Sequence, residues 1–431
     1  MRILFASTPG DGHFNPLTDL AVHLRDAGHD VRWYTGPSYA GRLEELGIPH
    51  LPYRRARDIN GQNVAVLFPE RVRLKGLALV RFDFEQLFIG NVEGQFDDMR
   101  AIARDFSFDV LIGEGGGLAA RLVRDVLGKH VVGIGVGAAL VVPPDGPPPF
   151  SGLRPARTPA GRLVHQAMYF AMQRLVLNHG LRAYNAIMSA HGLSPVATFE
   201  EMFRGHNVAF LNGVPGFDYP TRRPQLQVRY AGMLRPYRTS SATRPPELAA
   251  DGRRVVLISQ GTVDNDDPGK LIVPALEGLI PTGALLVVGT GHKHTEALRR
   301  RFPQANVSIH DYVDFEAVLE RTDVFVCNGG RGSVLLSLSK GVPLVGAGVR
   351  EGKNDVNAHV EHFGVGVNLR TEKPTAAKIA RAVGRVLAEP SFKRRARTLR
   401  DEISRYRPLE IIDEYLATEV DSSARSGSAT S

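Results

Sequence analysis

Residues 323–343 read DVFVCNGGRGSVLLSLSKGVP, in which an apolar strand runs directly into a glycine-rich turn and a helix follows. Gly330, Gly332 and Ser333 lie where the helix begins, and Gly341 ends it. A diphosphate needs backbone N–H groups that it can approach closely and a positive potential, and a glycine turn at a helix N-terminus supplies both. A tight turn without a ligand uses the same residues, so this stretch alone leaves both interpretations open.

Two more glycine loops in the same half of the chain favour a ligand site. Ser259, Gly261 and Thr262 close the apolar run RVVLIS, and Gly289 and Gly291 close the run ALLVV. In a doubly wound α/β sheet the carboxyl ends of the strands share one edge, and ligands bind in the crevice outside it. We therefore expect a phosphate-containing ligand at this edge of the sheet.

The first half of the chain shows the same alternation of strand and helix. RILFAST reads as a buried parallel strand, a helix follows from Pro16 with Asn15 as its N-cap, and DVRWYT reads as the next strand. The pattern predicts an α/β protein of two Rossmann-like, doubly wound domains that face each other across a cleft. The expected boundaries are 1–220 for the first domain, 221–252 for a linker rich in Pro, Arg, Ser and Thr, 253–395 for the second domain, 396–420 for a C-terminal helix returning to the first domain, and 421–431 for a disordered tail.

Composition and charge exclude other classes of protein. Of the 431 residues, 43% are hydrophobic and 23% charged, as in soluble globular proteins. The single cysteine, Cys327, allows no disulfide within the chain and favours a cytoplasmic setting. The net charge of +8 comes from arginines spread along the chain without interleaved aromatic residues, so we expect no nucleic-acid partner. No apolar stretch approaches the length of a membrane span, so we expect no stable membrane insertion.

A dinucleotide-dependent oxidoreductase is the obvious competitor for such a fold. Residues 10–15, GDGHFN, approach the G-x-G-x-x-G pattern, but Asn15 stands where the third glycine belongs. The second strand ends in Thr35 and Gly36, where an acidic residue would hold a ribose. The pattern therefore disfavours a dehydrogenase.

In this succession the stretches resemble glycosyltransferase family 1, the UDP-glycosyltransferases and macrolide glycosyltransferases of the GT-B fold, over nearly the whole chain. Residues 10–35 are similar to the family's Gly-His-x-x-Pro opening, 228–234 (VRYAGML) to the start of its linker, and 255–263 (VVLISQGTV) to its first C-terminal strand. Residues 306–319 (NVSIHDYVDFEAVL) resemble its nucleotide-base loop, and 327–358 its donor signature.

The resemblance implies an enzyme that moves a sugar from a UDP- or dTDP-sugar to a hydroxyl of an apolar small molecule, such as a natural product or antibiotic. The first domain would bind the acceptor and the second the nucleotide sugar. Transfer would invert the anomeric centre and would need neither a metal nor a cofactor. The acceptor pocket is expected from the stretches near 60–90 and 143–195. In the latter, a stripe of Met168, Tyr169, Phe170 and Met172 suits either core packing or a substrate pocket.

His13 is the candidate general base, because it lies at the end of the first strand, just before the predicted helix. The dipole of that helix disfavours the imidazolium, so a neutral base is expected at pH 7. Glu114 follows the strand FDVLIG and occupies the position that resembles the family's dyad aspartate. It would orient the histidine, although a glutamate favoured by a helix N-terminus is the simpler interpretation of the position.

The expected donor site combines the glycine loops with the residues that the resemblance indicates. Its members are Gly12, Ser259, Gly261, Thr262, Tyr312, Val313, Asn328, Gly330, Gly332, Ser333, Lys353 and Asn354. Several positions depart from the family pattern. Asn328 replaces a histidine that would face the diphosphate, Leu336 stands where an acidic residue often holds the ribose, and the stretch 351–354 replaces an acidic-Gln pair that reads sugar hydroxyls.

Asp264, Asn265 and Asp266 form a D-x-D-like cluster beside this site. Such a cluster can bind a divalent ion next to phosphate, but one short run supplies few fixed ligands, so a solvated acidic loop is favoured and no metal site is expected.

Two alternative functions stay open at this point. The departures in the donor signature are compatible with a non-catalytic protein that binds a nucleotide sugar or a partner. The stretch 66–88, VLFPERVRLKGLALVRFDFEQLF, is apolar and contains arginines, so it is compatible with a lipid-directed glycosyltransferase that docks on headgroups. Its simpler interpretation is a loop and helix packed on the first domain.

Overall fold

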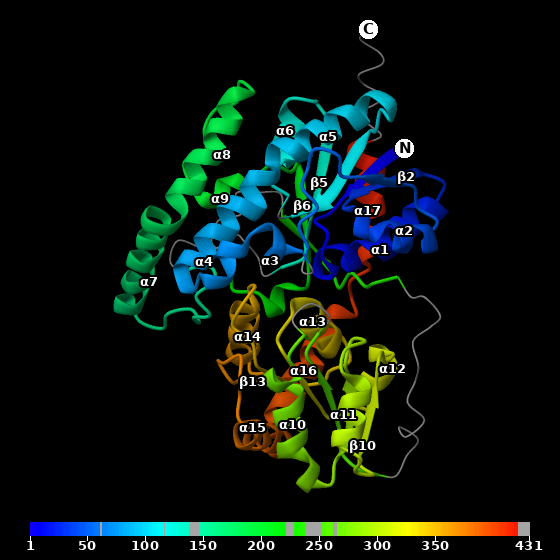
Figure 1. Cartoon of the computed structure of the whole chain (residues 1–431), viewed down its shortest axis with the longest axis vertical. Coiled ribbons are helices and arrows are strands. Elements are labelled where there is room, and N and C mark those ends of the chain that lie inside the picture. The colour runs from blue at the N-terminus through cyan, green and yellow to red at the C-terminus, as the bar shows by residue number, and fades with distance from the viewer. Residues whose placement is uncertain are drawn as a thin grey trace.

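The computed structural model describes residues 1–60, 63–115, 117–137, 146–220, 228–237, 252–261 and 265–420, which form two lobes, one above the other in Figure 1. Each lobe is built around a parallel sheet. The first sheet has the order β3-β2-β1-β4-β5-β6-β7 and the second the order β10-β9-β8-β11-β12-β13. All the ladders between these strands are parallel, which confirms the prediction of two doubly wound units.

The strands of both sheets are short and largely buried runs. Those of the first sheet are β1 (Arg2–Ala6), β2 (Asp30–Thr35), β3 (His50–Pro52), β4 (Val110–Glu114), β5 (His130–Gly135), β6 (Val208–Asn212) and β7 (Val228–Gly232). Those of the second are β8 (Val255–Ser259), β9 (Leu285–Gly289), β10 (Val307–His310), β11 (Val324–Cys327), β12 (Leu344–Gly346) and β13 (Gly366–Asn368). Helices cover both faces, so the inner strands read as continuous apolar runs rather than alternating ones.

Helices on both faces of the sheets complete each lobe. The first lobe holds α1 (Asp11–Asp26), α2 (Ala40–Glu45), α3 (Val64–Leu67), α4 (Gly76–Phe82), α5 (Val92–Asp105), α6 (Ala120–Asp125), α7 (Pro159–Met172), α8 (Asn178–Ala190) and α9 (Phe199–Met202), with the π-helical turns η3 (Asp83–Phe88) and η5 (Gln173–Leu177) and the 3-10 turn η6 (Pro215–Phe217). The second holds α10 (Ile272–Leu279), α11 (Thr295–Arg301), α12 (Phe315–Leu319), α13 (Arg331–Ser339), α14 (Lys353–His362), α15 (Ala376–Ala388) and α16 (Pro390–Ile403).

Helix α1 begins earlier than predicted. The backbone N–H groups of His13 and Phe14 both donate to the carbonyl of Gly10, at 2.9 Å each, so the first helical turn precedes Pro16. Gly10 has an extended backbone and takes the N-cap position that we assigned to Asn15. Proline is favoured at a helix start because it lacks an N–H, but here Pro16 lies inside the helix.

Two of the expected boundaries are wrong. Strand β7 pairs with β6 at the edge of the first sheet, so part of the expected linker, 228–232, belongs to the first lobe; its five residues are only partly buried and therefore show little apolar pattern. The C-terminal return begins at α17 (Pro408–Tyr415), not at residue 396. Helix α16 packs on α13 and α15 of the second lobe, whereas α17 packs on α1 and β7 of the first (Figure 1). Of the rest of the predicted linker, residues 221–227 and 238–251 lie outside the described residues, as does the tail 421–431.

Candidate active site

Strands β1 and β4 bring His13 and Glu114 together. Ala6 at the end of β1 is paired with Gly113 of β4, so the loop after β1 and the end of β4 meet at the same edge of the sheet. The Nδ1 atom of His13 is hydrogen-bonded to Oε2 of Glu114. The backbone N–H of Thr8 donates to Oε1 of Glu114 at 3.1 Å, and the Thr8 hydroxyl donates to the same oxygen. One oxygen of the Glu114 carboxylate therefore accepts hydrogen bonds from Thr8, and the other oxygen is hydrogen-bonded to His13.

The pKa of His13 is raised, which contradicts the expectation that the helix dipole keeps it low. Burial lowers the pKa of the imidazole, but the charge of Glu114 and the hydrogen bond to it outweigh that effect. Burial also opposes ionisation of Glu114, yet its pKa is lowered because His13 and Thr8 stabilise the carboxylate. The sequence analysis predicted the pairing of His13 with Glu114 but not the raised pKa of His13. A buried carboxylate in direct contact has a larger effect on that pKa than the partial charge of a helix end.

The ring of His13 is partly exposed, whereas its partner is buried. Its side chain is 39% exposed, whereas that of Glu114 is 5% exposed. With Nδ1 on Glu114, Nε2 is the nitrogen available to a substrate. The negative charge of Glu351, in the second lobe, also contributes to the raised pKa of His13. Glu351 also forms an ion pair with Lys353 at 2.7 Å.

Asn328 organises the loops of the second lobe. Its Nδ2 donates to the carbonyl of Gln260, and its Oδ1 accepts from the N–H of Gly330 at 3.2 Å. The side chain thus joins the loop after β8 to the loop after β11. We expected Asn328 to face the diphosphate, but the structure commits its oxygen and one of its amide protons to backbone groups.

Asn357 of α14 is a residue that the sequence analysis missed. It is fully buried, and its Nδ2 donates to the carbonyls of Asn328 and Gly348, at 3.3 and 3.0 Å. A Cβ atom at Gly329 or Gly346 would lie 2.3 or 2.0 Å from its side chain, so glycine is required at both positions. An asparagine inside a helix 29 residues downstream carries no local signal of this role.

The predicted phosphate-binding turn has the expected geometry. Helix α13 begins at Arg331 with Gly330 as its N-cap, and a Cβ at Gly332 would meet no atom within 4 Å. Ser259 is buried, and its hydroxyl accepts from the N–H of Gly261 at 3.2 Å. Ser333 lies in the first turn of the helix. Thr262 lies outside the described residues.

Tyr312 and the first turn of α1 approach each other from opposite lobes. Tyr312 is 46% exposed and stacks on His292, with ring centroids 6.0 Å apart and planes 12° apart. Burial raises the pKa of its phenol, and the charges of Arg42 and Asp11 both act on it. Gly12, in the same turn as Asp11, would have open space around a Cβ.

Val313, the next residue of the predicted base-binding loop, points elsewhere. It is fully buried in the hydrophobic core of the second lobe, and its side chain lies against Gly289. Its side chain faces the core because alternate residues of an extended segment face opposite sides and the Tyr312 ring takes the outer one, so the predicted donor contact of Val313 would rest on its backbone.

Asn354 and Asp355 at the start of α14 bind the loop that precedes α7 in the first lobe. The Asn354 amide donates to the carbonyl of Phe150 at 2.5 Å. The carboxylate of Asp355 accepts from the N–H groups of Phe150 and Gly152, at 2.6 and 2.7 Å. Burial raises the pKa of Asp355 to about 6 despite these two bonds. Asn354, predicted to read sugar hydroxyls, thus also connects the two lobes.

The D-x-D-like cluster does not converge in the described residues. Asn265 is buried and donates to the carbonyls of Thr290 and Gly291, at 3.1 and 3.4 Å. Asp266 is exposed and paired with Lys293. Asp264 lies outside the described residues, and within them no three His, Cys, Asp or Glu side chains gather as metal ligands.

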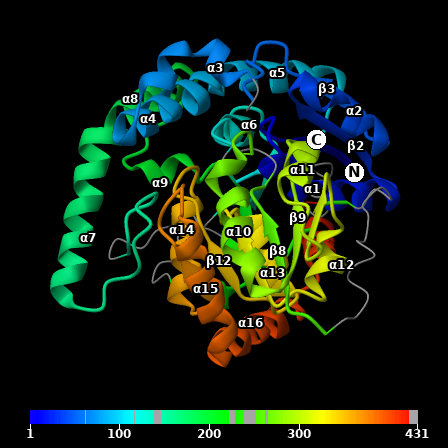
Figure 2. The same cartoon turned by 60° about the horizontal axis from the view of Figure 1, so that its bottom comes forward.

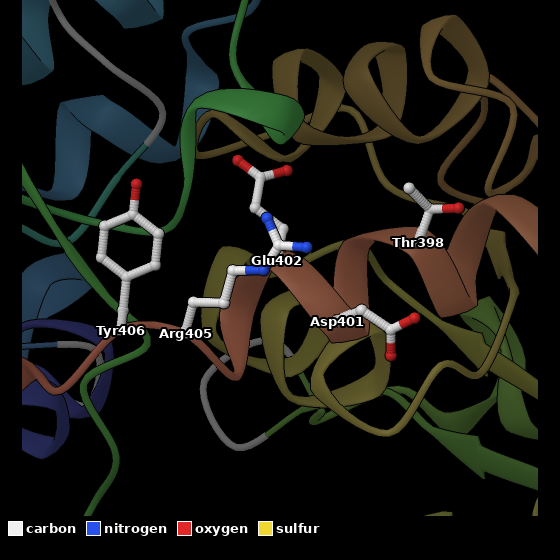
Figure 3. Close-up of a pocket in the computed structure, with 5 residues that line it drawn as sticks. All are labelled: Thr398, Asp401, Glu402, Arg405 and Tyr406. Carbon is white, nitrogen blue, oxygen red and sulfur yellow. The ribbon is translucent and has the colours of Figure 1, made fainter.

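One cavity is lined by none of the residues described above. It measures about 560 Å³ and is lined by Thr398, Asp401, Glu402, Arg405 and Tyr406 at the end of α16 (Figure 3). The Glu402 carboxylate accepts from the N–H of Gly216 at 3.0 Å, so this cavity marks the place where the last helices cross between the lobes.

Comparison with known proteins places the chain among sugar-transferring enzymes. Residues 280–418 match the family described as "Erythromycin biosynthesis protein CIII-like, C-terminal domain". The 4'-demethylrebeccamycin synthase of Lentzea aerocolonigenes is 34% identical over 406 residues, which cover 93% of this chain and 95% of that protein. The solved structure of the calicheamicin glycosyltransferase CalG4 has a TM-score of 0.76 at 19% identity and covers 97% of this chain and 98% of its own. That of glycosyltransferase VinC in complex with DTDP has a TM-score of 0.69 at 18% identity, with coverage of 98% and 100%.

Proposed function

Because the chain belongs to glycosyltransferase family 1 and has the GT-B fold, we propose that it is an inverting, metal-independent enzyme acting on an apolar small molecule. It would transfer a sugar from a UDP- or dTDP-sugar to a hydroxyl of that acceptor. A relative covering nearly the whole chain is named for a natural product that it synthesises, which supports an acceptor of that class. The lone and buried Cys327 is compatible with a cytoplasmic enzyme.

The hydrogen bond between His13 and Glu114 carries this proposal. Nε2 of His13 removes the proton of the acceptor hydroxyl while that oxygen attacks the anomeric carbon from the face opposite the diphosphate. The bond from the anomeric carbon to the diphosphate oxygen breaks, and its electron pair leaves with the nucleotide. Glu114 fixes the ring and stabilises the imidazolium that forms, as a carboxylate does in other His-based sites. A positioned base of this kind contributes roughly 10²–10⁴ in rate.

The departing diphosphate needs positive potential, which the second lobe offers without a metal. The N-terminus of α13 presents the backbone of Gly330, Gly332 and Ser333, and the helix dipole adds a partial positive charge there. Asn328 acts indirectly, because it holds the N–H of Gly330 and the neighbouring loop in place. Preorganised donors of this kind stabilise developing charge more than mobile ones do.

A thermal-shift measurement with UDP, dTDP, their glucose conjugates and NAD, each with and without EDTA, tests the donor site first. A nucleotide at a hundred times its dissociation constant stabilises a fold by roughly 2.7 kcal/mol. We expect one nucleoside diphosphate to raise the melting temperature, NAD to have no effect, and EDTA to change nothing. Loss of the shift with EDTA would contradict the metal-free mechanism, and a shift with NAD would contradict the family's donor class.

The stereochemical outcome is tested on the product. Proton coupling at the anomeric position by NMR distinguishes inversion from retention of a defined donor. If nucleotide binds but no acceptor is turned over by either the native chain or a His13→Ala variant, the alternative of a non-catalytic binding protein takes the lead.

A further inference from the structure

Helix α7 turns its apolar side away from the rest of the protein. Leu163, Val164, Met168 and Phe170 are 65, 56, 42 and 66% exposed, and among the residues of α7 only His165 is buried. At about 3.6 residues per turn, His165 lies roughly opposite Leu163 and Phe170. The helix thus contacts the rest of the protein through the side that carries His165. The sequence analysis left core packing and a substrate pocket open for this stripe; Met172 packs against the core of the first lobe, whereas Met168 and Phe170 are exposed.

The exposed surface continues beyond α7. Leu175 of η5, the next turn of the chain, is 74% exposed, and Leu77 of α4, which packs on η5, is 65% exposed. We call Leu163, Val164, Met168, Phe170 and Leu175 the α7 face. Isolated apolar residues on a surface are ordinary, but a contiguous group of this kind marks an interaction site.

The segment that carries the α7 face has charged side chains of one sign only, although the carboxylate of Glu200 from α9 lies against Gln173 and Tyr169. Residues 146–198 contain five arginines and neither aspartate nor glutamate. Within the described part of the chain, Arg162 and Arg174, on α7 and η5, make no side-chain hydrogen bond or ion pair. A second copy of the same face would bring arginine against arginine. The positive charge of this surface therefore favours an anionic partner and disfavours the pairing of two copies of the α7 face.

A basic recess lies at the start of the same helix. It measures about 250 Å³ and is lined by Arg154, Arg157, His362 and Arg370, together with Gly152, Leu153 and Pro155. Glu361 pairs with Arg154 at 3.6 Å and with Arg370 at 2.8 Å, whereas Arg157, one residue before the N-cap of α7, pairs with none of the described residues. Three guanidinium groups against one carboxylate leave an excess of positive charge suited to a phosphate group.

We propose that the α7 face docks on the surface of an anionic lipid bilayer, with Leu163, Phe170 and Leu175 entering the interface and the arginines on the headgroups. An apolar helix side flanked by arginines is the sequence pattern of helices that lie in a membrane interface. In both Figure 1 and Figure 2 α7 runs along the outer edge of the molecule, so it forms a ridge. A ridge enters a fluid interface, whereas a folded protein partner would need a matching groove.

This contact lies on the membrane and does not cross it. Among the described residues no helix is long and apolar enough to span a bilayer. The proposal concerns where the protein resides and does not depend on its activity. It centres the possible lipid contact on residues 159–177, next to Leu77 of the stretch 66–88 that we singled out in the sequence.

Co-sedimentation with phosphatidylcholine vesicles, with and without phosphatidylglycerol, tests the proposal. We expect binding to the vesicles that contain phosphatidylglycerol, weaker binding at high salt, and little binding to phosphatidylcholine alone. Each arginine near an anionic bilayer is worth roughly fivefold in partitioning, so the double variant Arg162→Gln/Arg174→Gln should bind roughly 25-fold more weakly. The double variant Leu163→Ser/Phe170→Ser should lose more than about tenfold.

Matched controls lie elsewhere on the surface. Lys378 and Arg381 are exposed on α15 of the second lobe, and Val126 is 41% exposed after α6. Lys378→Gln/Arg381→Gln and Val126→Ser should bind as the native protein does, and circular dichroism reports whether every variant folds. Absence of vesicle binding by the native protein, or equal losses in the controls, would overturn the proposal. So would light scattering that shows a dimer abolished by Leu163→Ser/Phe170→Ser without vesicle binding.

Discussion

The guanidinium of Arg331 donates two hydrogen bonds to the carboxylate of Asp218, at 3.0 and 2.9 Å, in a pair whose side chains are only 3% and 2% exposed. Its Nε also donates to the carbonyl of Asn212, at 3.1 Å. Arg331 is the first residue of α13, inside the predicted phosphate-binding turn, yet it points away from that turn into the junction between the lobes. The turn is thereby anchored to the segment that follows β6.

Breaking this pair should destabilise the protein strongly. Removal of one partner leaves a buried charge uncompensated, which costs about 3–5 kcal/mol. We expect Asp218→Asn or Arg331→Met to lower the free energy of unfolding by about that amount in urea titrations. The double variant Arg331→Met/Asp218→Leu should lose less than the sum of the single changes, because neither charge is then left alone. Additive losses would show that the two residues act independently.

His13→Ala should lower kcat by roughly 10²–10⁴ while the thermal shift caused by nucleotide persists. The nucleotide would contact the second lobe, so removing a base on the first lobe affects the chemistry and not donor binding. Asp105→Asn, an exposed change at the last residue of α5, is the matched control for kinetics. Retained turnover in His13→Ala would exclude this histidine as the base.

Glu114→Gln should shift the acidic limb of kcat/KM to lower pH. The active form of His13 is the neutral imidazole, so the rate falls as pH drops below its pKa. Glu114 raises that pKa through its charge and its hydrogen bond, and an amide removes the charge. We therefore expect a lower kcat in Glu114→Gln together with a lower apparent pKa. A limb that stays in place would mean that another group controls it.

Asp355→Asn should remove a pH dependence of stability. Burial raises the pKa of Asp355 to about 6, above the model-peptide value of about 3.9 that an unfolded chain would have. Between these two values the folded state holds more protons than the unfolded one, so the stabilising contribution is full below about pH 4 and is lost as pH rises through about 6. Urea unfolding at several pH values should show this decline in the native protein and in Asp105→Asn, but not in Asp355→Asn. Parallel curves for all three would refute the assignment.

Asn357→Ala should weaken nucleotide binding and stability together. The side chain satisfies two buried carbonyls of neighbouring loops, and leaving such groups unpaired costs about 1–3 kcal/mol. We expect a smaller thermal shift with nucleotide as the loops after β11 and β12 lose their common support. Gly346→Ala, which places a Cβ 2.0 Å from the Asn357 side chain, should be at least as damaging. Normal nucleotide affinity in both variants would show that the loops hold their shape without Asn357.

Local patterns were sufficient to predict the two sheets and the glycine turn before α13, whereas the family resemblance implied the meeting of His13 with Glu114. Each of these depends on a short apolar run, a turn residue or the end of a strand, and parallel pairing brings the ends of neighbouring strands to one edge. The same local rules misplaced the start of α1 and strand β7. For α1, the prediction relied on Pro16 as a helix start, whereas Gly10 is the N-cap. For β7, the short strand at the edge of the sheet shows no clear alternation of apolar and polar residues.

The sequence by itself thus determined the fold class, the family and the elements that meet in the cleft. Only the tertiary structure decided which partner each polar side chain takes. Arg331 and Asp218 are 113 residues apart, and Phe150 and Asp355 are 205 apart, so no local pattern reports either contact. Periodicity likewise shows that α7 has an apolar side, but the direction in which that side points is set by the packing of the whole lobe.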